Sequence, residues 1–347
     1  MSDKKNEIPE IEKLGEFGLI KRLTEKIKLN NTSSLVGVGD DAAVLDYKDK
    51  KILISTDILT EGIHFDLMYT PLKHLGYKAV ISNLSDIYAM NGTPEQIVIS
   101  MAVSAKFDVE MIEEIYAGIQ LACTDYGVDI VGGDTSSSLT GLTLSITVIG
   151  SANETDITYR SGAKKNDVIC VSGDLGAAFI GLQLLEREKE IFKSGSGVQP
   201  DLSGYEYILE RQLKPEARKD IVEKLKELGI KPTAMIDISD GLSSDLTHIC
   251  EESNAGCKLF ADKLPIDEST AETAEELNLE PVTIALNGGE DYELLFTIDI
   301  KDVEKISGLK EVTPIGHITD KEDGKHLITP EGNFIDLTAM GWNTFRE

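Results

Sequence analysis

The chain has 347 residues and a formal net charge of −27, from 61 acidic and 34 basic side chains. This length favours two domains, and a hydrophobic content of 41% is enough for real cores. So acidic a chain is a poor candidate for a nucleic-acid binder. The acidity has two interpretations: it keeps the protein soluble, or some of its carboxylates hold divalent cations, which prefer oxygen ligands.

The cysteines and the N-terminus exclude further classes. The four cysteines, Cys123, Cys170, Cys250 and Cys257, form no C-x-x-C pair, so the sequence has neither a zinc ribbon nor a thioredoxin motif. The first 12 residues are polar and charged, and no run of about 18 apolar residues occurs anywhere. We therefore expect a cytoplasmic protein with reduced thiols and no membrane partner.

The first half of the chain alternates between helix and strand patterns. Apolar side chains recur at helical spacing in three segments, and runs of β-branched and apolar residues mark strands between them. The expected helices are 16–28, 71–90 and 110–126, and the expected strands are 43–45, 51–56, 96–103, 130–135 and 142–149.

The second half repeats this style after a polar segment, 154–167, which we interpret as the junction between domains 1–155 and 156–347. Strands alternating with helices predict an α/β or α+β fold in both halves. The expected strands are 167–172, 234–238, 283–286, 293–298, 313–318 and 327–329, and the expected helices are 177–188, 217–228 and 242–252, with a loop at 192–203.

Carboxylates stand beside glycine or hydroxyl residues at the ends of several expected elements. Glycine lets the backbone turn tightly or approach a ligand closely, and the adjacent carboxylate then reaches into the same space. A single Gly-Asp is usually a turn former or a helix N-cap, and capping is the competing interpretation for Asp240. Several such loops that converge would make an oxygen-rich cage suited to Mg²⁺. These loops contain Asp40, Asp41, Asp57, Asp86, Asp134, Asp240, Glu290 and Asp291.

Several nucleotide-binding and catalytic motifs are absent. The sequence has no G-x-x-x-x-G-K-[ST] P-loop, no ordered set of protein-kinase H-R-D and D-F-G motifs, and no complete G-x-G-x-x-G after a strand. It also lacks H-E-x-x-H and G-x-S-x-G, which argues against a zinc peptidase and an α/β-hydrolase.

Three further side chains have both an ordinary and a functional interpretation. The ordinary one makes His64 and Arg160 surface residues and lets Trp342 close the C-terminal core. In the functional one, His64 donates to a phosphate or a substrate ring, and Arg160, beside Gly162, binds phosphate through its guanidinium. Trp342, the only tryptophan, then stacks on a flat heteroaromatic ligand.

Taken in order, these motifs resemble the thiamine-monophosphate kinase family. Each motif is weak by itself, but their order and approximate spacing hold from about residue 15 to 345, nearly the whole chain. The segment 191–201 departs from the family pattern, which we interpret as an inserted loop. The matching segments are 15–20, 37–42, 55–57, 62–65, 77–79, 83–86, 132–135, 158–163, 238–245 and 288–294.

The resemblance implies a fold like that of aminoimidazole ribonucleotide synthetase, with two α/β domains. In that fold the N-terminal domains pair across a homodimer, and sheets from two subunits form a barrel at its centre. The resemblance also implies the reaction: ATP passes a phosphate directly and in line, without a phosphoenzyme, to thiamine monophosphate, giving thiamine diphosphate and ADP.

The resemblance also assigns residues of this chain to three sets of ligands, and none as a catalytic base or nucleophile. The positions that bind several Mg²⁺ ions hold Asp41, Ser55, Thr56, Asp57, Asp86, Asp134, Asp240 and Asp245. The ATP-binding positions hold Tyr116, Gly133, Asp134, Arg160 and Ser244. The positions that bind thiamine monophosphate hold His64, Glu290 and Trp342.

General chemistry agrees with these roles. Phosphoryl transfer is mostly positioning and charge neutralisation, so Mg²⁺ ions on an aspartate cage can replace a P-loop. The attacking phosphate oxygen is largely ionised near neutral pH, so it needs no base. The thiazolium of thiamine is a cation, and Trp342 would attract it through a cation–π contact of about 0.5–2 kcal/mol.

Two alternatives stay open. The first is another ATP-dependent enzyme of the same superfamily, such as selenophosphate synthetase, a hydrogenase maturation factor or a purine synthetase. The selenium enzymes usually carry a reactive Cys near the N-terminus, and residues 1–20 have none. The second is a metal- or nucleotide-binding module that lost turnover. The intact carboxylate set argues against it, because loss of activity usually shows as a missing carboxylate.

Overall fold

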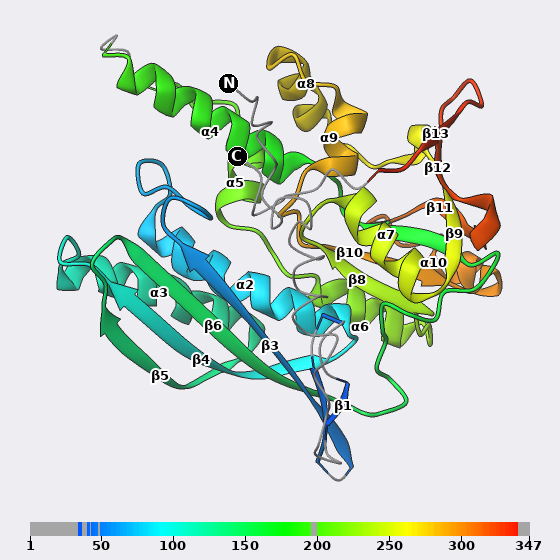
Figure 1. Ribbon diagram of the computed structural model, residues 1–347, viewed down its shortest axis with the longest axis horizontal. Helices are drawn as coiled ribbons and strands as arrows, with labels where there is room; N and C mark the ends of the chain where they lie inside the picture. Colours follow the sequence, from blue (N-terminus) through cyan, green and yellow to red (C-terminus); the bar gives the residue numbers. More distant parts are fainter. Residues whose placement is uncertain (1–33, 37–39, 42, 48, 196–199, 339–347) are drawn as a thin grey trace, which may run out of the picture.

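The computed structural model describes residues 34–36, 40–41, 43–47, 49–195 and 200–338 (Figure 1). The helix expected at 16–28, the loop glycines Gly37 and Gly39, and Trp342 lie outside these residues. Within them the chain forms two sheets with helices packed on them, so the predicted α/β (α+β) class is confirmed.

The first half forms a six-stranded sheet in the order β1-β2-β3-β6-β4-β5. Neighbouring strands are antiparallel except β4 and β5, which run parallel at one edge. A parallel pair needs a crossover, which helix α3 (Val109–Tyr126) supplies between these two strands. The strands are β1 (Ser34–Val36), β2 (Ala43–Tyr47), β3 (Lys50–Thr60), β4 (Thr93–Val103), β5 (Asp129–Ser137) and β6 (Leu142–Ala152).

Helix α2 (Leu72–Ala89) and helix α3 cover one face of this sheet (Figure 1). The two helices approach closely at two glycines. A Cβ atom on Gly76 would lie 2.0 Å from the Ile115 carbonyl oxygen, and one on Gly118 would lie 1.8 Å from the carbonyl oxygen of Lys73. Any other residue at these two positions would therefore push the helices apart.

The opposite face of the first sheet lies open in the part of the chain that the structure describes. Along β6, buried Leu144 and Ile146 alternate with the less buried Ser145 and Thr147. On β3, Ile58 is 56% exposed. This alternation is typical of a sheet that packs on a core with one face and leaves the other free.

The second half forms a seven-stranded sheet in the order β13-β12-β9-β11-β7-β10-β8. Neighbouring strands are antiparallel except β12 and β9, which are parallel. The strands are β7 (Val168–Ser172), β8 (Ala234–Ile238), β9 (Ala255–Phe260), β10 (Glu293–Ile298), β11 (Val312–Asp320), β12 (Lys325–Ile328) and β13 (Phe334–Asp336). The helices are α4 (Ala177–Lys193), α5 (Glu206–Leu213), α6 (Lys219–Glu227), α7 (Leu242–Glu252), α8 (Glu268–Glu276), α9 (Pro281–Asn287) and α10 (Val303–Ile306).

Helix α2 lies between the two sheets, with the first sheet on one side and β8 on the other (Figure 1). For this reason it is buried almost all round rather than along one stripe. Its Leu84 and Ile87 belong to the same core cluster as Met235 and Phe296 of the second sheet. The two halves therefore share one continuous hydrophobic core, and side chains on α2 can meet side chains from both.

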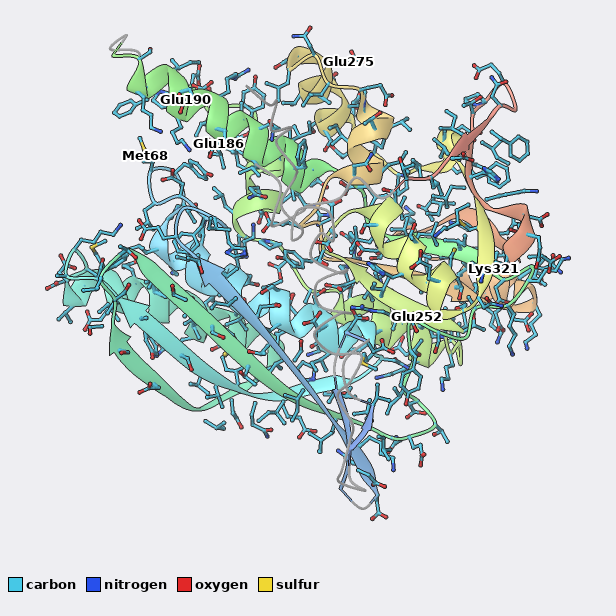
Figure 2. All side chains as sticks on the ribbon, viewed as in Figure 1. Met68, Glu186, Glu190, Glu252, Glu275 and Lys321 are labelled. Atoms are coloured by element: carbon cyan, nitrogen blue, oxygen red, sulfur yellow. The ribbon has the colours of Figure 1, made fainter. Side chains whose placement is uncertain are left out.

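The acidic surface accounts for part of the net charge. Glu190, Glu252 and Glu275 are exposed and lie on the outside of three different helices, α4, α7 and α8 (Figure 2). Such scattered charges are solvated and keep a protein soluble. Among the described helices, none combines the length and the apolar composition that crossing a membrane requires.

One secondary-structure expectation is wrong. The segment 283–286, expected as a strand, lies in helix α9. Pro281 occupies the first turn of this helix, where its missing N–H costs nothing, and the Glu280 carboxylate accepts from the backbone N–H groups of Val282 at 3.2 Å and Thr283 at 2.5 Å. These capping signals outweigh the short apolar run that had favoured a strand.

Other differences concern elements that the sequence patterns did not reveal. Helices α5 and α8 and strand β9 were not expected, and α4 continues five residues beyond 188 to Lys193. The first sheet ends at Ala152 and the second begins at Val168. The boundary at 155/156 lies between them and stays a prediction.

Candidate active site

Three carboxylates from distant segments meet where the two halves join. Asp41 precedes β2, Asp86 lies in the last turns of α2, and Asp237 lies in β8. Each offers a carboxylate oxygen, and these oxygens all lie within 4.8 Å of one another. Asp41 and Asp237 are buried, and Asp41 Oδ2 has no hydrogen-bond partner among the described residues. We call these three residues the carboxylate group.

Serine and asparagine side chains orient the carboxylate group and the residues beside it. Ser55 Oγ donates to Asp86 Oδ2 at 2.5 Å, and Ser85 Oγ donates to Asp237 Oδ2 at 2.6 Å. Asp57, two residues after Ser55 on β3, donates its backbone N–H to Asn83 Oδ1 at 3.0 Å. Helix α2 supplies Asn83, Ser85 and Asp86 from one stretch, because it is the element that both halves touch.

The carboxylate group is electrostatically unfavourable without a cation. Burial, followed by the charges of Asp57, Asp237 and Asp41, raises the pKa of Asp86 well above its usual range. Burial, followed by the charge of Asp41, raises the pKa of Asp237 to about 7, against a hydrogen bond from Ser85. Crowded buried carboxylates of this kind either hold protons or bind a cation. An all-oxygen donor set with an unused oxygen on Asp41 fits a hard divalent ion.

Arg160 is the cation that faces this group. Its guanidinium Nη2 hydrogen-bonds to Asp41 Oδ1, and its Nε lies 3.9 Å from Asp40 Oδ1. Burial, followed by the charge of Asp41, raises the pKa of Asp40 to about 6, although Arg160 lowers it. The resemblance implies a role for Arg160 at ATP, and the structure places it at the edge of the carboxylate group.

The turn between β8 and α7 and the start of α7 hold three predicted residues, Asp240, Ser244 and Asp245. Gly241 has a φ of 110°, and a Cβ there would lie 2.9 Å from the Asn287 carbonyl carbon, so the turn requires glycine. Gly241, rather than Asp240, holds the N-cap position of α7. Instead, the backbone N–H of Asp240 donates to Asp245 Oδ2 at 3.3 Å. Ser244 is buried on the same turn.

Burial, followed by the charges of Asp240 and Asp237, raises the pKa of Asp245 well above its usual range. Asp240 and Asp245 therefore border the carboxylate group.

Asp134 and Gly133 lie far from this group within one chain. In register, Asp57 pairs with Ile146, which pairs with Ile99, which pairs with Gly133. That row crosses three strand spacings, about 14 Å along the sheet. Asp134 occupies the next row with Ile58, whose side chain points to the open face. The metal role of Asp134 stays a prediction.

Two more predicted residues lie outside the group. Thr56 donates its hydroxyl to the Ile146 carbonyl oxygen at 3.0 Å, within the sheet. Tyr116 is partly buried on α3 against the core of the first half. Their predicted roles therefore find no support from contacts within the described chain.

Two residues predicted to bind the organic substrate are held by the backbone around them. His64 follows β3, and its Nδ1 accepts the Thr60 N–H at 3.0 Å, so its proton lies on Nε2, which is a donor. Glu290 lies in the loop before β10 with a left-handed φ of 66°, and its N–H donates to the Ser239 carbonyl oxygen at 2.8 Å. Burial, followed by Glu186, raises the pKa of Tyr69, and Glu290 adds a smaller contribution.

Asp237 is a residue that the sequence patterns did not single out. It stands inside the apolar run Met235–Ile238 of β8, and this pattern predicts a position in the core. The available signal was the run itself, because an unpaired carboxylate inside a buried strand is costly and calls for a proton, a partner or a cation.

Comparison with known proteins decides the family. A family model described as AIR synthase related protein, N-terminal domain, matches residues 39–152. The thiamine-monophosphate kinase of Aquifex aeolicus (strain VF5) is 34% identical over 338 residues, which cover 96% of this chain and 99% of that protein. That of Bacillus subtilis (strain 168) is 33% identical over 342 residues, covering 96% and 100%. The chain belongs to the thiamine-monophosphate kinase family.

Solved structures agree with the family and the fold. A structure described as AaThiL complexed with AMPPCP and TMP is 31% identical, has a TM-score of 0.82, and covers 98% of this chain and 100% of its own. The hydrogenase maturation protein HypE in complex with ATP has a TM-score of 0.69 at 21% identity, which supports the shared fold alone. The resemblance stated from the motifs is therefore confirmed, as is an AIR synthase-like fold.

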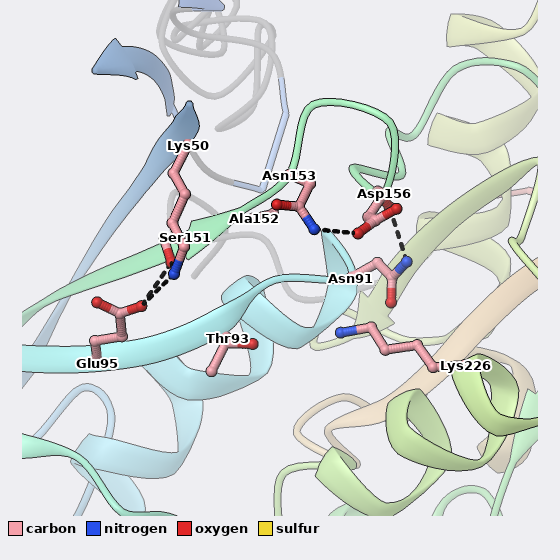
Figure 3. A pocket seen from close by; sticks show the side chains of 9 residues that line it. All are labelled: Lys50, Asn91, Thr93, Glu95, Ser151, Ala152, Asn153, Asp156 and Lys226. Carbon is pink, nitrogen blue, oxygen red and sulfur yellow. Dashed lines mark hydrogen bonds and ion pairs between the residues drawn. The ribbon is translucent and has the colours of Figure 1, made fainter. Parts of the chain in front are cut away.

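A separate hollow of about 160 Å³ lies between the ends of β4 and β6 and helix α6 (Figure 3). It is lined by two lysines, which invites comparison with the phosphate chemistry of this kinase family. Lys50 Nζ lies 3.7 Å from Glu95 Oε1, however, and Lys226 faces Asp156, whose charge opposes the lowering of the Lys226 pKa by burial. Each ammonium thus already has a carboxylate nearby, and the hollow is balanced in charge.

Proposed function

We propose that this chain is an ATP-dependent kinase that transfers the terminal phosphate of ATP to thiamine monophosphate, releasing thiamine diphosphate and ADP. The observation that carries the proposal is the carboxylate group of Asp41, Asp86 and Asp237, which lies where the two halves join. Full-length relatives with this kinase name, and a solved relative complexed with AMPPCP and TMP, support it.

Mg²⁺ is the cation that this site fits, because its donors are hard oxygens from several segments. Asp41, Asp86 and Asp237 would hold it, with Asp57 and Ser55 beside them. Mg²⁺, when bound, neutralises the phosphate charges and orients the two phosphates for in-line transfer. The proposal keeps Thr56, Asp134, Asp240 and Asp245 as further Mg²⁺ ligands.

The chain's own residues supply positioning and charge. The Arg160 guanidinium would donate to ATP phosphate oxygens in a fork geometry, and the His64 Nε2–H would donate to the phosphate or ring of thiamine monophosphate. No side chain has to remove a proton, since the attacking phosphate oxygen is largely ionised near neutral pH. Asp41, Asp237 and Asp245 are buried, which would limit the water that could compete as acceptor.

Arg160→Ala is expected to raise the KM for ATP by about 10- to 100-fold and to change the KM for thiamine monophosphate by less than about threefold. The reason is that a bidentate guanidinium–phosphate contact is lost on one substrate only. Steady-state kinetics with each substrate varied in turn measures both values. Arg187→Ala, on α4 and paired with its neighbour Glu188, is the matched control. An unchanged KM for ATP would remove Arg160 from the nucleotide site.

A homodimer completes the proposed site. Gly133 and Asp134 lie on the edge strand β5, three strand spacings from Asp57, yet the resemblance assigns them to ATP and Mg²⁺. The edge and the open face beside it expose apolar residues, with Val131 57% and Ile58 56% exposed. A second copy that covers this face would bury these side chains and bring its β5 residues toward the carboxylate group.

Val131→Glu is expected to shift the protein from dimer to monomer and to lower kcat/KM in parallel, because a buried charge at the centre of an apolar interface weakens association by at least about tenfold. Sedimentation velocity over a concentration series measures the dimer, and the kinase assay measures the activity. The control is Leu139→Glu, at a fully exposed loop tip, which should leave both unchanged. A wild-type protein that is fully active as a monomer would contradict the dimer proposal.

The kinase activity is tested by a coupled ADP-release assay with Mg²⁺, ATP, and either thiamine or thiamine monophosphate. We expect turnover with the monophosphate only, abolished by EDTA and restored by excess Mg²⁺. Folded protein that binds ATP but turns over neither acceptor would direct the search to another reaction of the same superfamily.

A further inference from the structure

Helix α2 carries a buried lysine that the proposed chemistry does not use. The Lys78 ammonium donates one hydrogen bond to the Gln212 carbonyl oxygen at 2.8 Å and another to Glu290 Oε2 at 3.1 Å. The Gln212 side-chain amide donates to the same Glu290 oxygen at 3.2 Å. Lys78 and Gln212 are buried, whereas the Glu290 side chain is 31% exposed. One oxygen of the Glu290 carboxylate is therefore held twice from the protein side.

The other Glu290 oxygen, Oε1, accepts no hydrogen bond from any residue that the structure describes. The backbone of Glu290 is also held, because its left-handed φ of 66° is rarely adopted by residues with a side chain and its N–H is bonded to Ser239. The preceding Gly289 packs against the same turn, since a Cβ there would lie 2.5 Å from the Ser239 carbonyl oxygen. Glu290 is thus fixed at both ends, and Oε1 is left for a ligand.

The same helix holds both ends of the site. Lys78 and Asp86 are eight residues apart on α2, which places them on one helical face at a rise of about 12 Å. Asp86 belongs to the carboxylate group, where the phosphates go in the proposed function, and Lys78 holds Glu290. Helix α2 therefore sets the separation between a phosphate-binding end and a free carboxylate oxygen, which suits an elongated substrate.

We infer that Lys78 is a positioning residue for recognition of the organic substrate, an inference that rests on the proposed function. Lys78 holds Glu290 so that Oε1 accepts a hydrogen bond from the exocyclic amine of the aminopyrimidine ring. In the two rings of thiamine monophosphate, this amine carries the only N–H donors; the thiazolium has none. The contact therefore recognises the end of the substrate that lies opposite to its phosphate.

A cation at position 78 matters because of what surrounds it. The Gln212 carbonyl oxygen and Glu290 Oε2 both point at one buried point, and an ammonium satisfies both with two of its three donors. A neutral apolar side chain there leaves both acceptors without a partner, so the Glu290 carboxylate turns toward water instead of the substrate. Because α5 carries Gln212 and α2 carries Lys78, the same contact also joins the two halves beside the substrate.

The test is the pair Lys78→Met and Lys78→Arg, assayed with each substrate varied in turn. We expect Lys78→Met to raise the KM for thiamine monophosphate by about 10- to 100-fold, the loss of a hydrogen bond to a charged group, with the KM for ATP changed by less than about threefold. Lys78→Arg keeps the charge and should recover part of the loss. The matched control is Lys73→Met, exposed on the same helix, which should change neither value.

A double-mutant cycle separates positioning from simple structural support. If Lys78 acts through Glu290, then Lys78→Met in a Glu290→Gln background adds less than about threefold to the KM for thiamine monophosphate. A substrate analogue in which the ring amine is replaced by a carbonyl oxygen tests the amine. Wild type should discriminate against it by about tenfold or more, and Lys78→Met should lose most of that discrimination.

The outcomes distinguish the two proposals. Wild type that does not turn over thiamine monophosphate overturns the proposed function and this inference with it. Wild-type turnover with an unchanged KM in Lys78→Met, or with fully additive effects in the double mutant, overturns the inference alone. If Lys78→Met does not fold, the amine-free analogue is assayed with wild type and with Lys78→Arg. Wild type that accepts the analogue and thiamine monophosphate equally overturns the inference.

Discussion

Asp86→Asn is expected to lower kcat/KM by about three orders of magnitude or more, because it removes a charged oxygen ligand from the centre of the carboxylate group. The neutral amide keeps the size of the side chain and its contact with Ser55, so the fold is retained. The coupled ADP-release assay with saturating ATP and varied thiamine monophosphate measures the loss. Asp262→Asn, an exposed carboxylate on the second half, is the matched control and should be fully active.

The same substitution is expected to stabilise the protein when no metal is bound. Asp86 is half-buried among Asp57, Asp237 and Asp41, and desolvation, followed by the charges of these three residues, raises its pKa, so its ionised form is unfavourable in the folded chain. Removing that charge should raise the Tm in EDTA and should abolish most of the further rise that Mg²⁺ causes in wild type. Near-normal turnover, or a lower Tm in EDTA with a full response to Mg²⁺, would place the metal elsewhere.

The second large effect is the pH dependence of the metal-free protein. An acid whose pKa is raised by folding binds protons more tightly in the folded chain, so the free energy of unfolding falls as pH rises through that pKa. The pKa of Asp237 is raised to about 7 and that of Asp40 to about 6, and those of Asp41, Asp57 and Asp86 are also raised. Wild type in EDTA should therefore lose on the order of a few kcal/mol of stability between about pH 4 and pH 7.

Some groups act in the opposite direction or do not respond to metal. The ion-paired carboxylates Asp66 and Glu186 have lowered pKa values, so their contribution to the stability of the protein is lost on acidification. This contribution is small, because both side chains are partly exposed and screened by solvent. Asp291, whose pKa burial raises to about 7, lies near Arg211 outside the carboxylate group. The contribution of Asp291 to the fall of the unfolding free energy with pH should persist when Mg²⁺ is present.

Urea unfolding between pH 5 and 8, in EDTA and in Mg²⁺, measures this effect. Mg²⁺ should raise the stability most at pH 8 and flatten the curve, since it takes the place of protons on the carboxylates. The variant Asp237→Asn should reduce the slope in EDTA. Stability in EDTA that rises from pH 5 to pH 8 would contradict the electrostatic description of the site.

The fold could be predicted where signals are local. The long helices near 71–90 and 110–126 and the strands near 142–149 and 293–298 follow from spacing and composition, and they occur close to the expected bounds. Helix α8 was missed because it is rich in Glu and Thr and has few apolar positions to mark a face. Helix α9 was misassigned because seven residues are too few for a periodic pattern, so the capping by Glu280 decides it.

The site could be predicted in part for the same reason. Asp41, Asp57, Asp86 and Asp240 lie one or two residues after a glycine or serine, and such sequence neighbours mark a carboxylate as unusual. Asp237 stands among apolar neighbours in β8, and nothing local marks it. Only the packing of β8 against α2 brings its carboxylate to Ser85 and Asp86.

The sequence by itself determined the fold class, the family, and most of the carboxylates that the site contains, because motif order and local composition carry that information. Tertiary structure alone decided which of them meet. Strand order places Gly133 and Asp134 three strands away from Asp57, and the burial of α2 between two sheets brings Lys78 to Glu290 and Asp86 to Asp237. The physical reason is that strand pairing and helix packing join residues far apart in the chain, and their geometry depends on every element between them.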